Sequence, residues 1–85
     1  MITREIVRKK LLAYLNHSVS LAELVDWAET TLLHGELDQQ DAAVLRDVLA
    51  RLGLADVREF GLSWEDCTEL LGRLGYVLQV SAVPA

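Results

Sequence analysis

Few side chains in this sequence could act as nucleophiles or metal ligands. Cys67 is the only cysteine, and the two histidines, His17 and His34, lie far apart in the chain. A reactive cysteine needs a neighbouring base that stabilises its thiolate. Cys67 has no basic residue beside it and falls on an apolar helical stripe, so we predict a buried and inert thiol. The histidines lack the short spacing of a metal-ligating pair, and we predict no metal site.

Carboxylates gather between two predicted helices, at Glu36, Asp38 and Asp41. Oxygen-rich loops can bind Ca²⁺, but a calcium loop has a glycine at its sixth position and a glutamate at its twelfth. This segment has neither and is too short to wrap a cation, so we interpret these acids as solvated helix caps. Elsewhere no nucleophile, histidine and orienting acid follow a recognisable catalytic order. We therefore predict that the protein is not an enzyme and binds no cofactor.

The composition is typical of one small folded domain. The chain has 85 residues, of which 52% are apolar. This excludes intrinsic disorder, which requires low hydrophobicity together with high net charge. A chain of this length forms a single unit, here residues 1–85, with a small core. Its apolar runs are too short to cross a bilayer and no apolar signal region follows the basic start, so we expect a cytoplasmic protein that does not enter membranes.

The net charge of −5 is unevenly distributed. Residues 1–17 carry +3 and residues 18–85 carry −8, and residues 18–45 contain six acids with no lysine or arginine. Binding of nucleic acid relies on basic side chains that neutralise phosphates, so this distribution disfavours a nucleic-acid partner. Two interpretations remain open. Either the basic first helix neutralises the acidic second one, or an acidic face steers a basic protein partner.

Capping residues and glycines divide the chain into helices. Ser20 and Glu23 form the S-x-x-E pattern of a capping box, which makes this helix start the clearest local signal. Gly35 is expected to supply the left-handed residue that ends this second helix, and Gly75 to close the last one. The apolar stripes direct Leu32 and Trp64 toward the core. The predicted helices cover residues 4–16, 21–34, 39–52 and 64–74.

The pattern changes after Gly75 to a segment rich in aromatic and β-branched residues, which predicts a strand over residues 76–80. A strand must pair its backbone groups with something, and the sequence contains no strong second strand. It could pair with residues 56–60 or pack on the core, or it could extend the sheet of another chain in a homodimer or a different protein. The predicted fold class is therefore mainly α, a small four-helix domain with a short C-terminal β-strand. The strand residues are Tyr76, Val77, Leu78, Gln79 and Val80.

Residues 54–74 have the apolar and glycine spacing of a helix-turn-helix. The second helix of that unit would present Glu65, Asp66 and Glu69 to DNA, where carboxylates would face phosphates. We therefore interpret this unit as a helix pair used for packing or protein contact.

Trp27 lies off the main apolar stripe of the second helix and is bordered by Glu23, Asp26 and Thr30. Two interpretations are open. Either this helix is buried on two sides, or Trp27 is an exposed aromatic anchor of the kind that dominates interface energies.

Two segments, residues 11–15 (LLAYL) and residues 19–24 (VSLAEL), together resemble the first helical hairpin of the colicin D-type immunity proteins, a family of small acidic helical bundles. The resemblance covers about 20 residues of the chain. It implies an inhibitor that covers the basic active site of a nuclease toxin with acidic side chains.

We therefore expect a non-enzymatic protein-interaction module that neutralises a basic partner, as an immunity protein or antitoxin does. The alternative is a self-associating structural or regulatory module that dimerises through residues 76–80. The candidate partner-binding residues are Glu23, Asp26, Trp27, Glu29, Glu36, Asp38 and Asp41.

Overall fold

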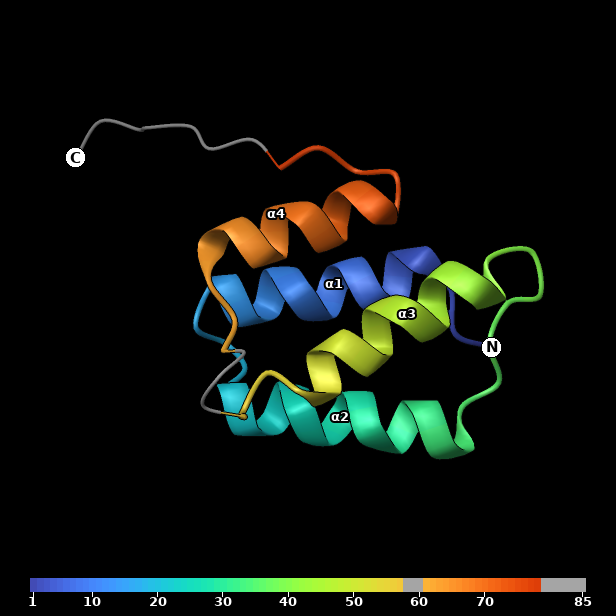
Figure 1. The fold of residues 1–85 in the computed structure, drawn as a ribbon, viewed down its shortest axis with the longest axis horizontal. Coiled ribbons are helices and arrows are strands. Elements are labelled where there is room, and N and C mark those ends of the chain that lie inside the picture. Colours follow the sequence, from blue (N-terminus) through green and yellow to red (C-terminus); the bar gives the residue numbers. More distant parts are fainter. Residues whose placement is uncertain (58–60, 79–85) are drawn as a thin grey trace.

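The computed structural model describes residues 1–57 and 61–78, which form four α-helices (Figure 1). They are α1 (Arg4–Leu15), α2 (Leu21–His34), α3 (Ala42–Gly53) and α4 (Trp64–Arg73). The α2–α3 pair packs most extensively, and α1 and α3 separate α4 from α2. The prediction of a mainly helical four-helix fold is confirmed. No helix in the described part of the chain is long and apolar enough to span a membrane.

Capping boxes start α2 and α4. The Glu23 N–H donates to the Ser20 hydroxyl at 3.1 Å, and the Ser20 N–H donates to the Glu23 carboxylate at 3.1 Å. Ser63 and Asp66 repeat the arrangement at 3.1 and 2.9 Å. Each box gives partners to two backbone amides that the helix itself leaves free. These local sequence signals therefore fix where the two helices begin.

The third helix begins at Ala42 rather than near residue 39, because Asp38 forms a turn first. The Asp38 carboxylate accepts a hydrogen bond from the Gln40 N–H at 3.1 Å, and its carbonyl accepts one from the Asp41 N–H at 3.1 Å. Asp41 occupies the N-cap position of α3, but its side chain makes no capping hydrogen bond. The other helix ends differ from the predicted ones by at most one residue, within the usual spread of helix boundaries.

The core lies where the inner faces of the four helices meet. The prediction that Leu32 and Trp64 point inward is wrong, since their side chains are 39% and 49% exposed. The buried positions of α2 are Leu24, Val25, Ala28 and Thr31, which together form one helical face, and Leu32 lies at the edge of this face. Trp64 is the first residue of α4. The core side chains are Val7, Leu11, Leu24, Ala28, Leu45, Val48, Leu49, Leu52, Cys67, Leu70, Leu71 and Leu74.

Gly35 ends α2 for a reason other than the predicted one. Its φ of −74° and ψ of 148° are extended, so the expected left-handed conformation is wrong there. A Cβ at Gly35 would lie 2.5 Å from the Thr31 carbonyl oxygen, so the position needs a residue without a side chain. Gly75 has a φ of +91°, which confirms the left-handed conformation at the end of α4.

The N-terminal residues connect distant parts of the chain. The Ile2 N–H donates to the Glu36 carbonyl at 2.6 Å, and the Ile2 carbonyl accepts from the Asp38 N–H at 2.9 Å. This parallel bridge between Ile2 and Leu37 holds the N-terminus beside the α2–α3 connection (Figure 1). Arg4 then donates to the Leu74 carbonyl at 3.2 Å, so the start of the chain also contacts the end of α4.

The segment after α4 forms neither helix nor strand over residues 76–78. Tyr76 and Leu78 pack against the core, whereas Val77 is 85% exposed. The predicted strand continues through Gln79 and Val80, which lie outside the described residues, as do residues 58–60 of its possible partner segment. In the proposed helix-turn-helix unit, residues 54–57 form turns rather than a helix.

Candidate protein-interaction surface

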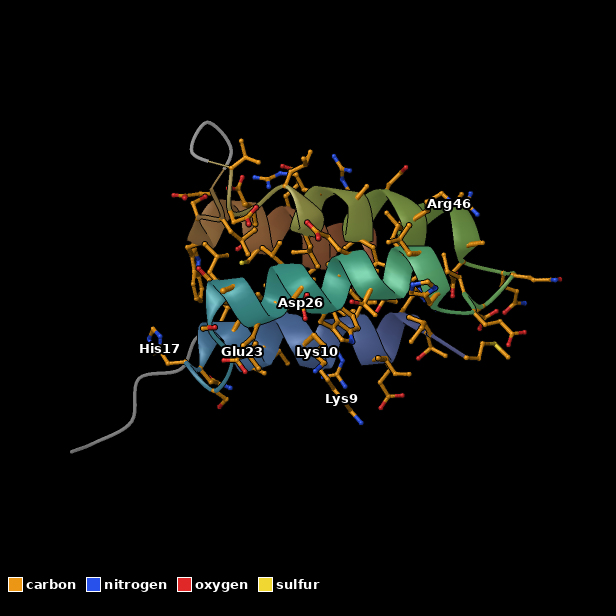
Figure 2. All side chains as sticks on the ribbon, turned by 90° about the horizontal axis from the view of Figure 1, so that it is seen from below. Lys9, Lys10, His17, Glu23, Asp26 and Arg46 are labelled. Carbon is orange, nitrogen blue, oxygen red and sulfur yellow. The ribbon has the colours of Figure 1, made fainter. Side chains whose placement is uncertain are left out.

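The seven predicted contact residues do not share one surface. Glu23, Asp26 and Trp27 line a hollow together with Lys10 of α1. Figure 2 shows Glu23, Asp26 and Lys10 on this side of the molecule. Glu29 lies toward the end of α3, since its Cγ would be 3.4 Å from a Cβ placed on Gly53. The remaining three, Glu36, Asp38 and Asp41, lie in the α2–α3 connection.

Asp38 and Asp41 have contacts within the chain. Asp41 forms an ion pair with Arg4 at 3.2 Å, and Asp38 caps the turn before α3 through the Gln40 N–H. Glu36 contributes its carbonyl to the bridge with Ile2. These interactions fix the α2–α3 connection, and a role of the three acids in contacting a partner remains a prediction.

Trp27 packs against the core as a half-buried side chain. The Lys10 ammonium lies 5.4 Å from the centroid of its ring, a cation–π geometry. This arrangement favours the interpretation that α2 is buried on two sides over that of a free aromatic anchor. Nothing local in the sequence indicates the contact, because Lys10 and Trp27 belong to different helices.

The ion pairs of the basic side chains of α1 are made with acids outside α2. Arg4 pairs with Asp41, whereas Arg8 and Lys9 lie 3.8 and 3.5 Å from Glu5 on their own helix. Arg8 also lies over the ring of Tyr76, at 5.1 Å from its centroid. In residues 1–57 and 61–78, no ion pair joins α1 to an acid of α2. The two helices are neighbours, but ion pairs between them do not neutralise the acids of α2.

The acids of α2 differ in their surroundings. Glu23 is held in its capping box, and hydrogen bonds from the Ser20 backbone and side chain, with a smaller contribution from the charge of Lys10, lower its pKa. Asp26 and Glu29 are exposed and form no ion pair within the described part of the chain. All three acids are exposed, and Asp26 and Glu29 differ from Glu23 in that their carboxylates are not engaged in a capping box.

Acid is expected to destabilise the starts of α2 and α4. Hydrogen bonds from the capping serines lower the pKa of Glu23 from 4.5 and that of Asp66 from 3.8. Because each pKa is lower in the folded state, ionisation stabilises the fold above the unfolded-state pKa, and this contribution disappears as pH falls through the folded-state value. Thermal unfolding followed by circular dichroism should show Tm falling as pH drops below 4.5, the ordinary pKa of Glu23, and continuing to fall below 3.8, that of Asp66.

The matched variants for this prediction are Glu23→Gln and Asp66→Asn, which keep an acceptor oxygen but cannot titrate. Their Tm should depend less on pH over the same range. A pH dependence as steep as that of the wild type in both variants would contradict the assignment to the capping boxes.

Cys67 is fully buried in the core, as predicted. Burial raises the pKa of its thiol to about 11, with a further increase from the charge of Asp66 and an opposing effect of Arg51. At pH 8 only about one thiol in a thousand would then be ionised. In the described residues, no group of three or more histidine, cysteine, aspartate or glutamate side chains is placed to hold a metal ion.

The Cys67 thiol should therefore resist alkylation in the folded protein. With iodoacetamide at about pH 8, mass spectrometry should show modification at least about a hundredfold slower in buffer than in denaturant. Equal rates in the two conditions would show that the thiol is accessible, contrary to its position in the core.

A hollow of about 640 Å³ lies at the end of the molecule where α1 ends and α2 and α4 begin. Its lining includes Tyr14, Val19, Leu62 and the half-exposed Trp64. The apolar periodicity of the sequence gives no sign of this surface, because it places Trp64 on the inner face of its helix. One local feature of the sequence indicates that Trp64 is exposed. Trp64 directly follows the capping Ser63 and is therefore the first residue of its helix.

No protein-family model matches the chain, and no match was found among curated proteins or among solved structures. Function is therefore inferred from surface geometry and charge.

Proposed function

We propose that this chain is a non-enzymatic protein-interaction module that neutralises a basic partner, in the manner of an immunity protein or antitoxin. The observation that carries the proposal is the set of charges left open on α2. Asp26 and Glu29 are exposed and form no ion pair in the described residues, while Arg4, Arg8 and Lys9 of α1 pair with acids outside α2. Exposed carboxylates that form no ion pair within the chain attract a basic protein and speed its association.

The packing of α2 supports a role as a rigid acidic surface. Its inner face is anchored in the core by Leu24 and Ala28, and Trp27 packs against the core under Lys10. Its start is fixed by the Ser20 capping box. A preorganised surface of this kind loses little conformational entropy on binding. The resemblance of residues 11–15 and 19–24 to colicin D-type immunity proteins implies the same class of function.

The test is purification of the tagged protein from its native host. We expect a basic protein to be retained in stoichiometric amount by the wild type, and to be lost from an Asp26→Lys, Glu29→Lys variant. The matched control is Asp47→Lys, Glu65→Lys, which makes the same charge change on exposed positions of α3 and α4. The association rate of the isolated pair should fall by about tenfold or more in the first variant only.

Two outcomes would reject the proposal. One is the absence of any stoichiometric partner, and the other is equal retention of the partner by the α2 variant and the control. If the partner is a toxin, co-expression of the wild type, and not of the α2 variant, should restore growth of cells that produce it.

A second candidate function is self-association through residues 76–80, and one observation favours it. Tyr76 and Leu78 pack inward while Val77 is 85% exposed, which is the alternation typical of a strand with one buried face. In the described part of the chain, no backbone hydrogen bond joins Val77 or Leu78 to another segment. Such an edge could extend the sheet of another chain.

Sedimentation equilibrium separates this candidate from a monomer. A dimer formed by the intact chain should be lost on truncation after Gly75 and weakened by Val77→Asp, which keeps the packing of Tyr76 and Leu78. A chain that sediments identically before and after both changes does not dimerise through this segment.

A further inference from the structure

A groove between α1 and α4 holds the first residues that follow α4. The two helices lie side by side and run in opposite directions, and after Gly75 the chain runs back toward the start of α4 (Figure 1). The Arg8 guanidinium of α1 lies 5.1 Å from the centroid of the Tyr76 ring. A cavity of about 250 Å³ in the groove is lined by Arg8, Leu12, Leu71, Tyr76, Val77 and Leu78.

The groove leads into the hollow at the end of the molecule. On α1, Arg8, Leu12 and Leu15 follow the i, i+4, i+7 spacing of one helical face. On α4, Leu71 and Trp64 are seven residues apart, which also places them on one face. Leu15 and Trp64 line the hollow of about 640 Å³. The two faces that enclose the segment after α4 therefore continue as far as this hollow.

The hollow has an apolar lining that is incompletely buried. Trp64 is half exposed, and the other apolar lining residues are partly buried, namely Tyr14, Leu15, Val19, Leu21 and Leu62. Among the polar lining residues, Ser20, Glu23 and Ser63 are already engaged in the capping boxes, and His17 and Ser18 are exposed. The hollow therefore favours an apolar occupant, because apolar surface gains free energy when it leaves water.

The spacing of the segment after α4 predicts which of its residues reaches the hollow. Tyr76 and Leu78 pack against the core and the residue between them is exposed, so alternate side chains point into the groove. Two residues of extended chain advance by about 6.6 Å. Four residues of a helix advance by about 6 Å, so the step from Tyr76 to Leu78 matches that from Arg8 to Leu12. The next inward position in an extended chain is Val80, which would lie level with the last turn of α1.

We propose that the segment after α4 continues along this groove and covers the hollow, with Val80 placed between Leu15 and Trp64. Residues 79–85 lie outside the described residues, and their sequence, QVSAVPA, contains apolar side chains and no charged one. Such a segment can enter an apolar hollow without removing an ion from water. While it is in place, the hollow is closed to a partner protein, which would have to displace the segment to reach Trp64.

Continuity with the groove selects this segment over other occupants. The segment is joined to the groove through Leu78, so its effective concentration at the hollow exceeds that of a separate molecule. A separate peptide would also lose its translational and rotational freedom on binding. The inference involves neither Asp26 nor Glu29 and is independent of the proposed basic partner. It also leaves Val77 facing outward.

Quenching of Trp64 fluorescence by acrylamide measures whether the hollow is covered. In a full chain with Trp27→Phe, Trp64 is the only tryptophan. We expect it to be protected from the quencher. Adding Val80→Asp should raise the quenching constant by about twofold or more, because an unpaired carboxylate does not enter an apolar hollow.

Two further variants in the same background serve as controls. Val77→Asp introduces the same charge at an outward position and should leave the quenching of Trp64 unchanged. Val80→Ile keeps an apolar side chain and should keep Trp64 protected. Circular dichroism of each variant checks that the helices are intact. Val80→Ser removes the same apolar contact without a charge, and it replaces Val80→Asp if the helical signal of that variant is lost.

Dilution distinguishes the chain's own segment from that of a second copy. Protection of Trp64 by its own segment should be the same at every protein concentration, because the contact is intramolecular. Protection by a second copy would disappear together with the dimer, which sedimentation equilibrium detects.

Three results would overturn the proposal. Trp64 could be quenched as readily in the Trp27→Phe chain as in its Val80→Asp variant. The Val77→Asp and Val80→Asp substitutions could have equal effects on quenching. Finally, protection could decrease on dilution in parallel with the dissociation of a dimer.

Discussion

Leu49→Ala is expected to lower the free energy of unfolding by about 2–5 kcal/mol. Leu49 is fully buried on α3, the helix that packs against both α2 and α4. Truncation to alanine removes apolar contacts and leaves a cavity that the neighbouring helices fill only in part. A domain of this size has a total stability of roughly 4–13 kcal/mol, so this one change removes a large share of it.

Chemical denaturation followed by circular dichroism measures the effect. The matched control is Leu33→Ala on α2, where the side chain is 78% exposed and the same substitution should change stability by at most about 0.5 kcal/mol. Comparable losses in the two variants would mean that Leu49 does not lie in the core.

Gly35→Ala is expected to cost about 1–3 kcal/mol, although the backbone angles of Gly35 suit any residue. The added methyl would lie 2.5 Å from the Thr31 carbonyl oxygen and 2.9 Å from the Thr31 methyl. Relief requires the end of α2 to move. That movement would disturb the hydrogen bond from the Gly35 N–H to the Thr31 carbonyl, which is 2.7 Å long, and the neighbouring bridge of Glu36 to Ile2.

Gly72→Ala is the matched control. Gly72 lies within α4, and a Cβ there would meet nothing within 4 Å. Alanine is favoured over glycine in a helix, so this variant should be more stable than the wild type by about 0.5–1 kcal/mol. Opposite signs for the two substitutions in thermal or chemical unfolding are the expected result. A stabilised Gly35→Ala variant would show that the close approach at Thr31 is not a constraint.

The sequence indicates which side chains of the candidate site are charged, but not which of them lie on the same surface. The sequence places Glu23, Asp26 and Glu29 close together on α2 and so predicts one acidic surface, yet Glu29 lies toward the end of α3 while Glu23 and Asp26 adjoin α1. The sequence shows that residues 1–17 are basic and residues 18–85 are acidic. It does not show the partners of these charges, because ion pairs such as that of Arg4 with Asp41 join residues far apart in the sequence.

The sequence by itself determined the features that depend on neighbouring residues. A capping box set the start of α2, helical periodicity identified the inward position of Cys67, and a glycine closed α4 at Gly75. These signals act within one or two helical turns and so can be read along the chain.

Only the tertiary structure decided which surfaces adjoin. It placed Lys10 over Trp27, joined Ile2 to Leu37, exposed Trp64 and brought Thr31 against Gly35 at the end of α2. It also placed the basic face of α1 beside the acidic face of α2, while the ion pairs of α1 formed elsewhere. The first two of these contacts join residues from separate segments, and the exposure of Trp64 depends on how the helices pack. The close approach at Gly35 depends on the path by which the chain leaves α2, which no local preference specifies.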